Sequence, residues 1–90
     1  MTLTNAHRRT LKSKAQRLKP VVWVGQKGLT DAVLAEIDHA LDAHQLVKVK
    51  MRGSEKVQRA KDIETMTSIL DVDLVNAVGA TVVIYRAEPT

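Results

Sequence analysis

The chain has 90 residues, which suits one domain with a single core, and we expect residues 1–90 to form it. It carries 14 Lys and Arg against 10 Asp and Glu, a net charge of +4, and has no cysteine, so disulfides and thiolate metal sites are excluded. Its longest apolar runs, such as Val21–Val24, are far shorter than the roughly 20 residues of a membrane span, so we expect a cytoplasmic protein that does not enter membranes.

The N-terminal segment predicts a basic helix. Thr4 is a favourable N-cap, and an apolar stripe recurs at helical spacing through Leu11, Ala15 and Leu18. Pro20 should end the helix, because proline disfavours helical backbone in the residue before it. Residues 1–19 hold six cations and no carboxylate: Arg8, Arg9, Lys12, Lys14, Arg17 and Lys19. Such polarised charge favours a polyanionic partner on this side, with a merely solvated basic helix as the alternative.

The next elements are a strand, a turn and a second helix. Val21–Val24 is apolar without alternation, which predicts a strand covered on both faces and places Trp23 in the core. Gly25–Gly28 forms a turn, and Thr30 caps a helix that follows. That helix buries a stripe made of Val33, Leu34, Ile37 and Leu41.

The segment Leu46–Arg52 alternates strictly and predicts a half-buried strand. One face holds Val47, Val49 and Met51, and the other holds Lys48, Lys50 and Arg52. Gly53-Ser54 then opens a third helix, with Val57, Ala60, Glu64 and Thr67 at helical spacing and further apolar contacts from Ile63, Met66 and Leu70.

The C-terminal part predicts a hairpin. Asp73–Val78 and Thr81–Arg86 flank the turn Gly79-Ala80, and Glu88–Thr90 is a frayed tail. The element order is α-β-α-β-α-β-β. Right-handed crossovers favour parallel pairing of the first strands, while the hairpin is antiparallel. The sequence therefore predicts an α/β two-layer sandwich with a mixed four-stranded sheet.

No residue pattern indicates catalysis, so we expect no enzyme, cofactor, metal site or small-molecule substrate. The three histidines, His7, His39 and His44, do not converge, and each is expected at the surface. Asp38 and Asp42 share a helix face that we expect to be solvated. Nucleophile-elbow, Walker and dinucleotide signatures are all missing from the sequence.

The turn Gly25-Gln26-Lys27-Gly28 is the first candidate binding site. It lies between a strand and a helix N-terminus, where glycines allow close backbone approach and the helix end and Lys27 attract a phosphate. Asp31 in the first helical turn counts slightly against this, and a purely structural turn is the alternative.

The cationic row Lys48, Lys50 and Arg52 is the second candidate. Like charges on one strand face repel each other, which a structural role would not favour, although an edge strand protected by charge is the alternative. Because aromatic side chains are scarce, we expect binding dominated by backbone and shape, with little reading of bases.

Four ordered motifs resemble the YhbY family, the stand-alone bacterial members of the CRM (chloroplast RNA splicing and ribosome maturation) domain. They are Leu18-Lys19-Pro20-Val21-Val22, residues 24–30 (VGQKGLT), residues 46–50 (LVKVK) and residues 78–86 (VGATVVIYR). The resemblance covers residues 3–86 and implies a fold similar to the C-terminal domain of translation initiation factor three. Between Glu64 and Asp73 the chain departs from the family, which often has a Gly-containing helix exit there.

The resemblance also implies a protein that binds ribosomal RNA in precursors of the large subunit and acts in ribosome assembly. We expect it to be a monomer. In the family the GxxG loop and the neighbouring basic surface contact RNA. Here those loop positions are Gly25, Gln26, Lys27 and Gly28. From the charge pattern we also expect RNA contacts from Arg8, Arg9, Lys12, Lys14, Lys19, Lys48, Lys50 and Arg52. The alternatives are a protein-interaction adaptor, using the acidic second helix or the hairpin edge, and nonspecific DNA binding.

Overall fold

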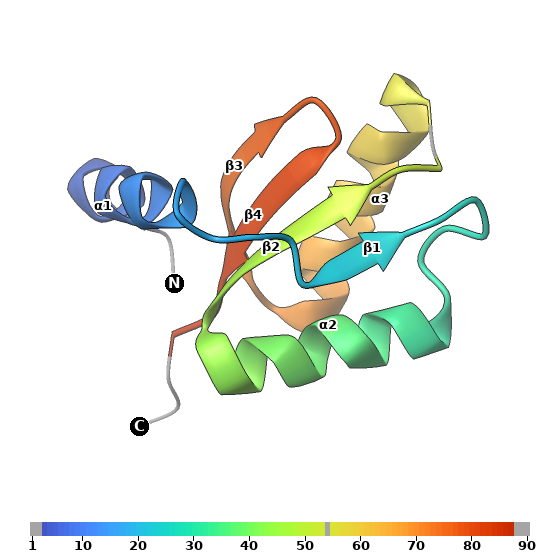
Figure 1. The fold of residues 1–90 in the computed structure, drawn as a ribbon, viewed down its shortest axis with the longest axis horizontal. Helices are drawn as coiled ribbons and strands as arrows, with labels where there is room; N and C mark the ends of the chain where they lie inside the picture. Colours follow the sequence, from blue (N-terminus) through green and yellow to red (C-terminus); the bar gives the residue numbers. More distant parts are fainter. Residues whose placement is uncertain (1–2, 54, 88–90) are drawn as a thin grey trace.

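The computed structural model describes residues 3–53 and 55–87. Along the chain it has the elements α1 (Asn5–Ala15), β1 (Val22–Val24), α2 (Asp31–His44), β2 (Leu46–Met51), α3 (Lys56–Leu70), β3 (Asp73–Val78) and β4 (Thr81–Tyr85) (Figure 1). The predicted order α-β-α-β-α-β-β is confirmed. The predictions for Ser54 and for Glu88–Thr90 lie outside the described residues.

The four strands form one mixed sheet in the order β1-β2-β4-β3. β1 and β2 are parallel, with Trp23 opposite Lys50, whereas β4 is antiparallel to both of its neighbours. The predicted hairpin at Gly79-Ala80 is thus confirmed, and β3 contains an irregularity between Leu74 and Asn76. Since β2 and β4 are internal, β1 and β3 provide the two edges of the sheet.

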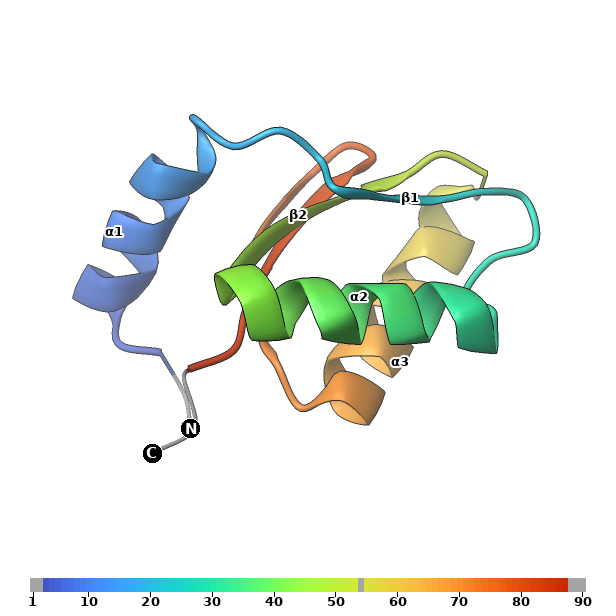
Figure 2. The same ribbon diagram turned by 60° about the horizontal axis from the view of Figure 1, so that its bottom comes forward.

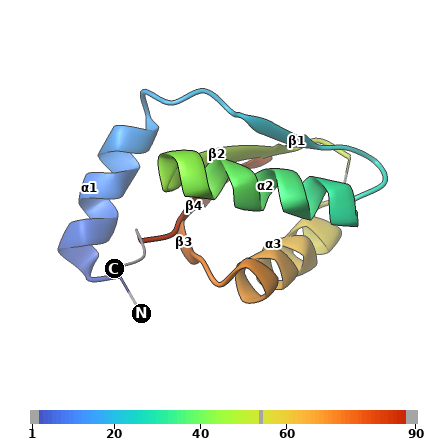
Figure 3. The ribbon, with the colours of Figure 1, turned by 90° about the horizontal axis from the view of Figure 1, so that it is seen from below.

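The main core lies between the sheet and the pair α2 and α3, which cover the same face (Figure 3). The alternation predicted for β2 is confirmed, because Val47, Val49 and Met51 are all fully buried. The whole buried set is aliphatic or Met: Val22, Val24, Ile37, Leu41, Val47, Val49, Met51, Met66, Leu70, Val82 and Ile84. In the predicted stripe of α2, Ile37 and Leu41 are buried, while Val33 and Leu34 pack at its margin.

α1 stands apart from the other helices and packs against the opposite face of the sheet (Figure 2). Leu11 and Ala15 form a second buried cluster with Val75 and Val83, flanked by Leu3, Leu46 and Tyr85. Thr4 caps α1 as predicted, since its hydroxyl accepts a hydrogen bond from the backbone N–H of His7 at 3.0 Å. This helix covers part of that face only.

The predicted end of α1 at Pro20 is wrong, because the helix ends at Ala15. Beyond it the backbone hydrogen bonds change to i+3 spacing, from Arg17 N to Lys14 O (3.2 Å) and from Leu18 N to Ala15 O (3.0 Å). Such tighter turns rotate later residues off the apolar stripe. Leu18 is consequently 37% exposed and does not join the core as predicted.

The third helix also differs from the prediction. Met66 and Leu70 are its buried residues, with Ile63 at their margin, whereas Val57 lies exposed. Asp71 ends the helix in the left-handed conformation at φ 53°, where glycine is usual. An aspartate tolerates this conformation, which explains how the chain leaves the helix without the glycine that similar proteins often have.

Arg86 connects the two helices of the main core. Its guanidinium lies 2.7 Å from the Asp38 carboxylate and 3.5 Å from that of Asp42, and it donates to the carbonyl oxygen of Leu70 at 2.6 Å. Asp38 and Asp42 remain 50% and 67% exposed, so the expected solvated face is confirmed, but their shared partner Arg86 was not expected. One cation directly after β4 holds the middle of α2 and the end of α3 together.

Replacing Leu11 with Asp should lower the free energy of unfolding by about 3 kcal/mol or more, because it buries an unpaired carboxylate against the sheet. Urea denaturation measures the change. Ile69→Asp is the matched control, since Ile69 is exposed on α3 and its replacement should change stability by about 0.5 kcal/mol or less. Equal stability of the two variants would contradict the docking of α1.

Candidate nucleic-acid interface

The GxxG loop is a tight turn between β1 and α2. The backbone N–H of Gly28 donates to the carbonyl oxygen of Gly25 at 3.0 Å, and Gly28 has φ +72°, a conformation that favours glycine. The Thr30 hydroxyl accepts from the backbone N–H of Val33 at 3.2 Å, which caps α2 as predicted. Lys27 is exposed at the tip, so the loop presents a full positive charge beside a helix N-terminus.

Gly53 supports the loop from the end of β2, a contact that sequence analysis missed. A Cβ atom at this position would lie 2.4 Å from both the backbone nitrogen of Gln26 and the carbonyl carbon of Gly25. The backbone N–H of Arg52 also donates to the carbonyl oxygen of Val24 at 2.9 Å, which keeps the two segments together. The signal in the sequence was a glycine directly after the strand that pairs with β1.

A hollow of about 630 Å³ adjoins the loop on the side of α3. It is lined by residues 25–29 and by Gly53, Glu55, Gln58, Asp62 and Thr65. The carboxylates of Glu55 and Asp62 repel phosphate there. A nucleic-acid backbone would therefore meet the loop more favourably from its other side.

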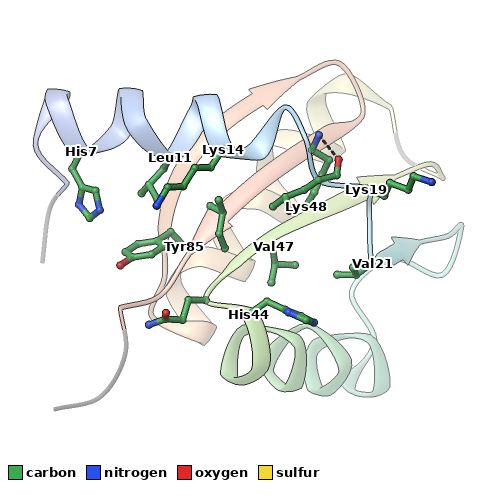
Figure 4. A pocket seen from close by; sticks show the side chains of 12 residues that line it. His7, Leu11, Lys14, Lys19, Val21, His44, Val47, Lys48 and Tyr85 are labelled. Carbon is green, nitrogen blue, oxygen red and sulfur yellow. Dashed lines mark hydrogen bonds between the residues drawn. The ribbon is translucent and has the colours of Figure 1, made fainter.

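A second hollow, which we call the basic cleft, lies between α1, the start of β2 and the end of α2 and has a volume of about 550 Å³ (Figure 4). Lys14, Lys19 and Lys48 line it together with apolar groups such as Leu11 and Val21. In Figure 4, Lys14 extends from α1 toward Tyr85, whereas Lys19 points away from Lys14. The fold thus gathers cations from three separate segments around one apolar depression.

Aromatic and imidazole rings line the part of the basic cleft next to β4 and the end of α2. Tyr85 on β4 packs edge-on against the ring of His7, with ring centroids 5.4 Å apart, and His44 lines the cleft from the end of α2. The expectation that the histidines lie at the surface is confirmed, since His7, His39 and His44 are all exposed. No pattern in the sequence indicates that His7 and His44 border the same cleft.

The cationic row lies on an internal strand. β2 has β1 on one side and β4 on the other, so the alternative of an edge strand protected by charge is wrong. The ammonium group of Lys48 donates to the carbonyl oxygen of Leu18 at 3.0 Å, and that of Lys50 donates to the Thr81 hydroxyl at 3.3 Å. Arg52 follows the strand and is exposed.

The basic side chains of α1 have different environments, and not all of them lie at the basic cleft. Arg8 donates through its guanidinium to the carbonyl oxygen of Leu74 and so helps to dock the helix on β3. Arg9 and Lys12 are exposed but do not line the basic cleft, whereas Lys14 does. The residues predicted to bind RNA therefore fall into the loop, the basic cleft with the strand row, and the outer surface of α1.

Trp23 does not lie in the core, contrary to the prediction. Its neighbours Val22 and Val24 are 1% and 2% exposed, but the indole itself is 53% exposed. The strand alternates after all, and Val21 (43% exposed) belongs to the segment before it. The apolar character of Val21 concealed the alternation in the sequence.

Neither a metal-binding cluster nor a membrane-spanning helix is found in the described parts of the chain. Residues 3–53 and 55–87 contain no group of three or more His, Cys, Asp or Glu side chains that could hold a metal ion. No helix in these segments is both long and apolar enough to cross a membrane.

Residues 3–86 match the model of the CRS1 / YhbY (CRM) domain. The chain is 37% identical over 89 residues to a protein of Pseudomonas aeruginosa named "probable RNA-binding protein", covering 99% of this chain and 86% of the relative. It is 38% identical over 85 residues to an RNA-binding protein of Haemophilus influenzae, covering 94% and 86%. The solution structure of a hypothetical protein from Staphylococcus aureus superimposes with a TM-score of 0.85 at 27% identity, covering 99% and 93% of the two chains.

Gly53→Ala should displace the GxxG loop, because its methyl group would overlap the backbone of Gln26. We expect a loss of about 1–3 kcal/mol in the free energy of unfolding, as is typical of overpacking, together with amide chemical-shift changes concentrated in residues 25–28. Gly25→Ala is the control, since the space around Gly25 is open. Unchanged loop resonances in Gly53→Ala would show that Gly53 does not set the position of the loop.

Proposed function

We propose, because the chain belongs to the CRS1 / YhbY (CRM) domain family, that it is an RNA-binding protein. Its target in this proposal is ribosomal RNA in precursors of the large subunit, and its role is in ribosome assembly. The bacterial relatives named for RNA binding support the first part. The second part rests on the resemblance of the four sequence motifs to the YhbY family.

The observation that carries the proposal is a series of cations on β2 and on the segments that precede and follow β1. The chain runs from the end of α1 along β1 to the GxxG loop (Figure 1), with the basic cleft at one end and Lys27 at the other. Phosphates bound there would release counterions, which gives affinity without sequence recognition. Of the predicted residues, Lys14, Lys19, Lys27, Lys48 and Lys50 are the best placed, and Arg9, Lys12 and Arg52 extend the surface.

Binding in this proposal needs no catalytic chemistry, and the relatives are named for what they bind. The domain spanning residues 1–90 would act as a monomer in the cytoplasm. The adaptor alternative has less support, because Arg86 pairs with both Asp38 and Asp42 on the acidic helix. Those carboxylates contribute to the fold and are less available to a partner protein.

Sedimentation of a cell extract tests the proposed target. At low salt the protein should travel with precursors of the large subunit, and raising the salt should release it, because each phosphate contact adds to the salt dependence. For about five to eight contacts, the logarithm of affinity for a ribosomal RNA fragment should fall against the logarithm of salt with a slope of several units. Protein that stays at the top of the gradient at low salt would contradict the ribosomal target.

A charge change in the loop tests the proposed site. Gly25 has open space around it and does not need positive φ, so Gly25→Asp and Gly25→Asn should both fold. Only the aspartate adds a negative charge beside the bound phosphate, and we expect it to weaken RNA binding at least about tenfold relative to the asparagine. Lys27→Ala should cost about 1 kcal/mol and lower the salt slope by about one.

Fluorescence anisotropy of labelled RNA measures these affinities, and urea denaturation confirms that each variant is folded. Equal affinities of Gly25→Asp and Gly25→Asn would mean that no phosphate lies near the loop. Binding would then have to depend on the basic cleft and the outer surface of α1.

A further inference from the structure

Trp23 holds an unusual position in this fold. It is the only tryptophan of the chain and lies in the middle of β1, between two fully buried valines. The valines fill the core beneath α2 and α3, so the indole projects from the opposite face, with 53% of its surface in water. Leu18 and Val21, just before it, are also exposed, at 37% and 43%.

This exposure forgoes stabilisation that full burial of the indole would provide. An indole has the largest apolar surface of any side chain, and half of that surface gains nothing from burial. α1 covers the same face of the sheet only over β3, β4 and the start of β2, where its residues cluster with Val75 and Val83. The part of the face that carries Trp23 lies beyond this cluster.

The surroundings of Trp23 are cationic. Lys50 is its direct partner across the parallel pair of β1 and β2, and Lys48 projects from the same face of β2. Their ammonium groups donate to neutral oxygens, those of Thr81 and Leu18, so these contacts leave both positive charges uncompensated. A flat apolar ring beside such charges matches the chemistry of a nucleotide, which joins a flat base to a phosphate.

We propose that Trp23 is a stacking platform for one unpaired base of bound RNA, with Lys48 and Lys50 holding the flanking phosphates; the inference rests on the proposed RNA binding. A base pair inside a duplex is already stacked on both faces and cannot cover the indole. The site therefore selects single-stranded or bulged RNA without reading its sequence, since every base has a π-face. A second copy of the chain fits less well, because β1 has three residues and the lysines of two copies would repel each other.

The single tryptophan makes the test direct, because all indole emission comes from Trp23. Three probes are compared: a single-stranded RNA oligonucleotide, the blunt duplex that it forms with its complement, and inorganic polyphosphate. Anisotropy of a label on the RNA reports binding independently of the indole. At saturation, the single strand should strongly quench Trp23 emission, whereas the duplex and polyphosphate should change it little.

Variants measure the contribution of the ring. Trp23→Leu should weaken binding of the single strand roughly fivefold to hundredfold, the range that base stacking on an aromatic side chain provides, while Trp23→Phe should retain most of the affinity. Duplex affinity should not change in either variant. Val78→Ala is the matched control, since Val78 is an exposed apolar residue on β3, the other edge strand, and its truncation should leave RNA binding unaltered.

The outcomes separate this inference from the proposed function. If the single strand binds by anisotropy but leaves Trp23 emission unchanged, or if Trp23→Leu binds as well as the parent, the stacking platform is disproved and RNA binding stands. If neither RNA changes in anisotropy, the proposed function itself fails. If the emission changes with protein concentration in the absence of RNA and the protein self-associates, a second copy covers Trp23 and the inference is wrong.

Discussion

The alternation of β2 is the constraint on which the rest of the structure depends. Val47, Val49 and Met51 are completely buried, so this strand cannot shift by one residue without exposing three apolar side chains and burying lysines. β1 pairs with it on one side and β4 on the other. The register of β2 therefore decides that Lys48, Lys50 and Trp23 share one face, because Trp23 lies opposite Lys50.

Much of the fold could be predicted because strong local patterns agree with it. The two capping threonines, the alternation of β2 and the glycine turn of the hairpin each depend on nearby residues only. The failures occurred where a distant contact decides the outcome. The end of α1 depends on how the chain must turn to reach β1, and the pairing of Asp38 and Asp42 depends on Arg86, which lies 44 residues after Asp42.

The candidate site was predictable in its residue types but not in its grouping. A basic N-terminal segment, a GxxG turn and a lysine row can all be read from the sequence, yet only the tertiary structure brings Lys14, Lys19 and Lys48 around one cleft. It also removes Arg8 from the free cations by engaging it with Leu74. The glycine after β2 is visible in the sequence, but its support of the loop is a backbone contact with Gln26 that only the tertiary structure reveals.

The distribution of acidic groups bears on the side from which RNA would approach the domain. The hollow between the loop and α3 contains Glu55 and Asp62, and the middle of α2 presents Asp38 and Asp42. These carboxylates lie on the helical side, away from the face that carries Trp23. A polyanion would be repelled by these carboxylates and attracted to the lysines of β2, a charge difference that favours approach to the open face of the sheet. Orientation by charge would then bring the open part of the sheet, with its exposed indole, toward the RNA first.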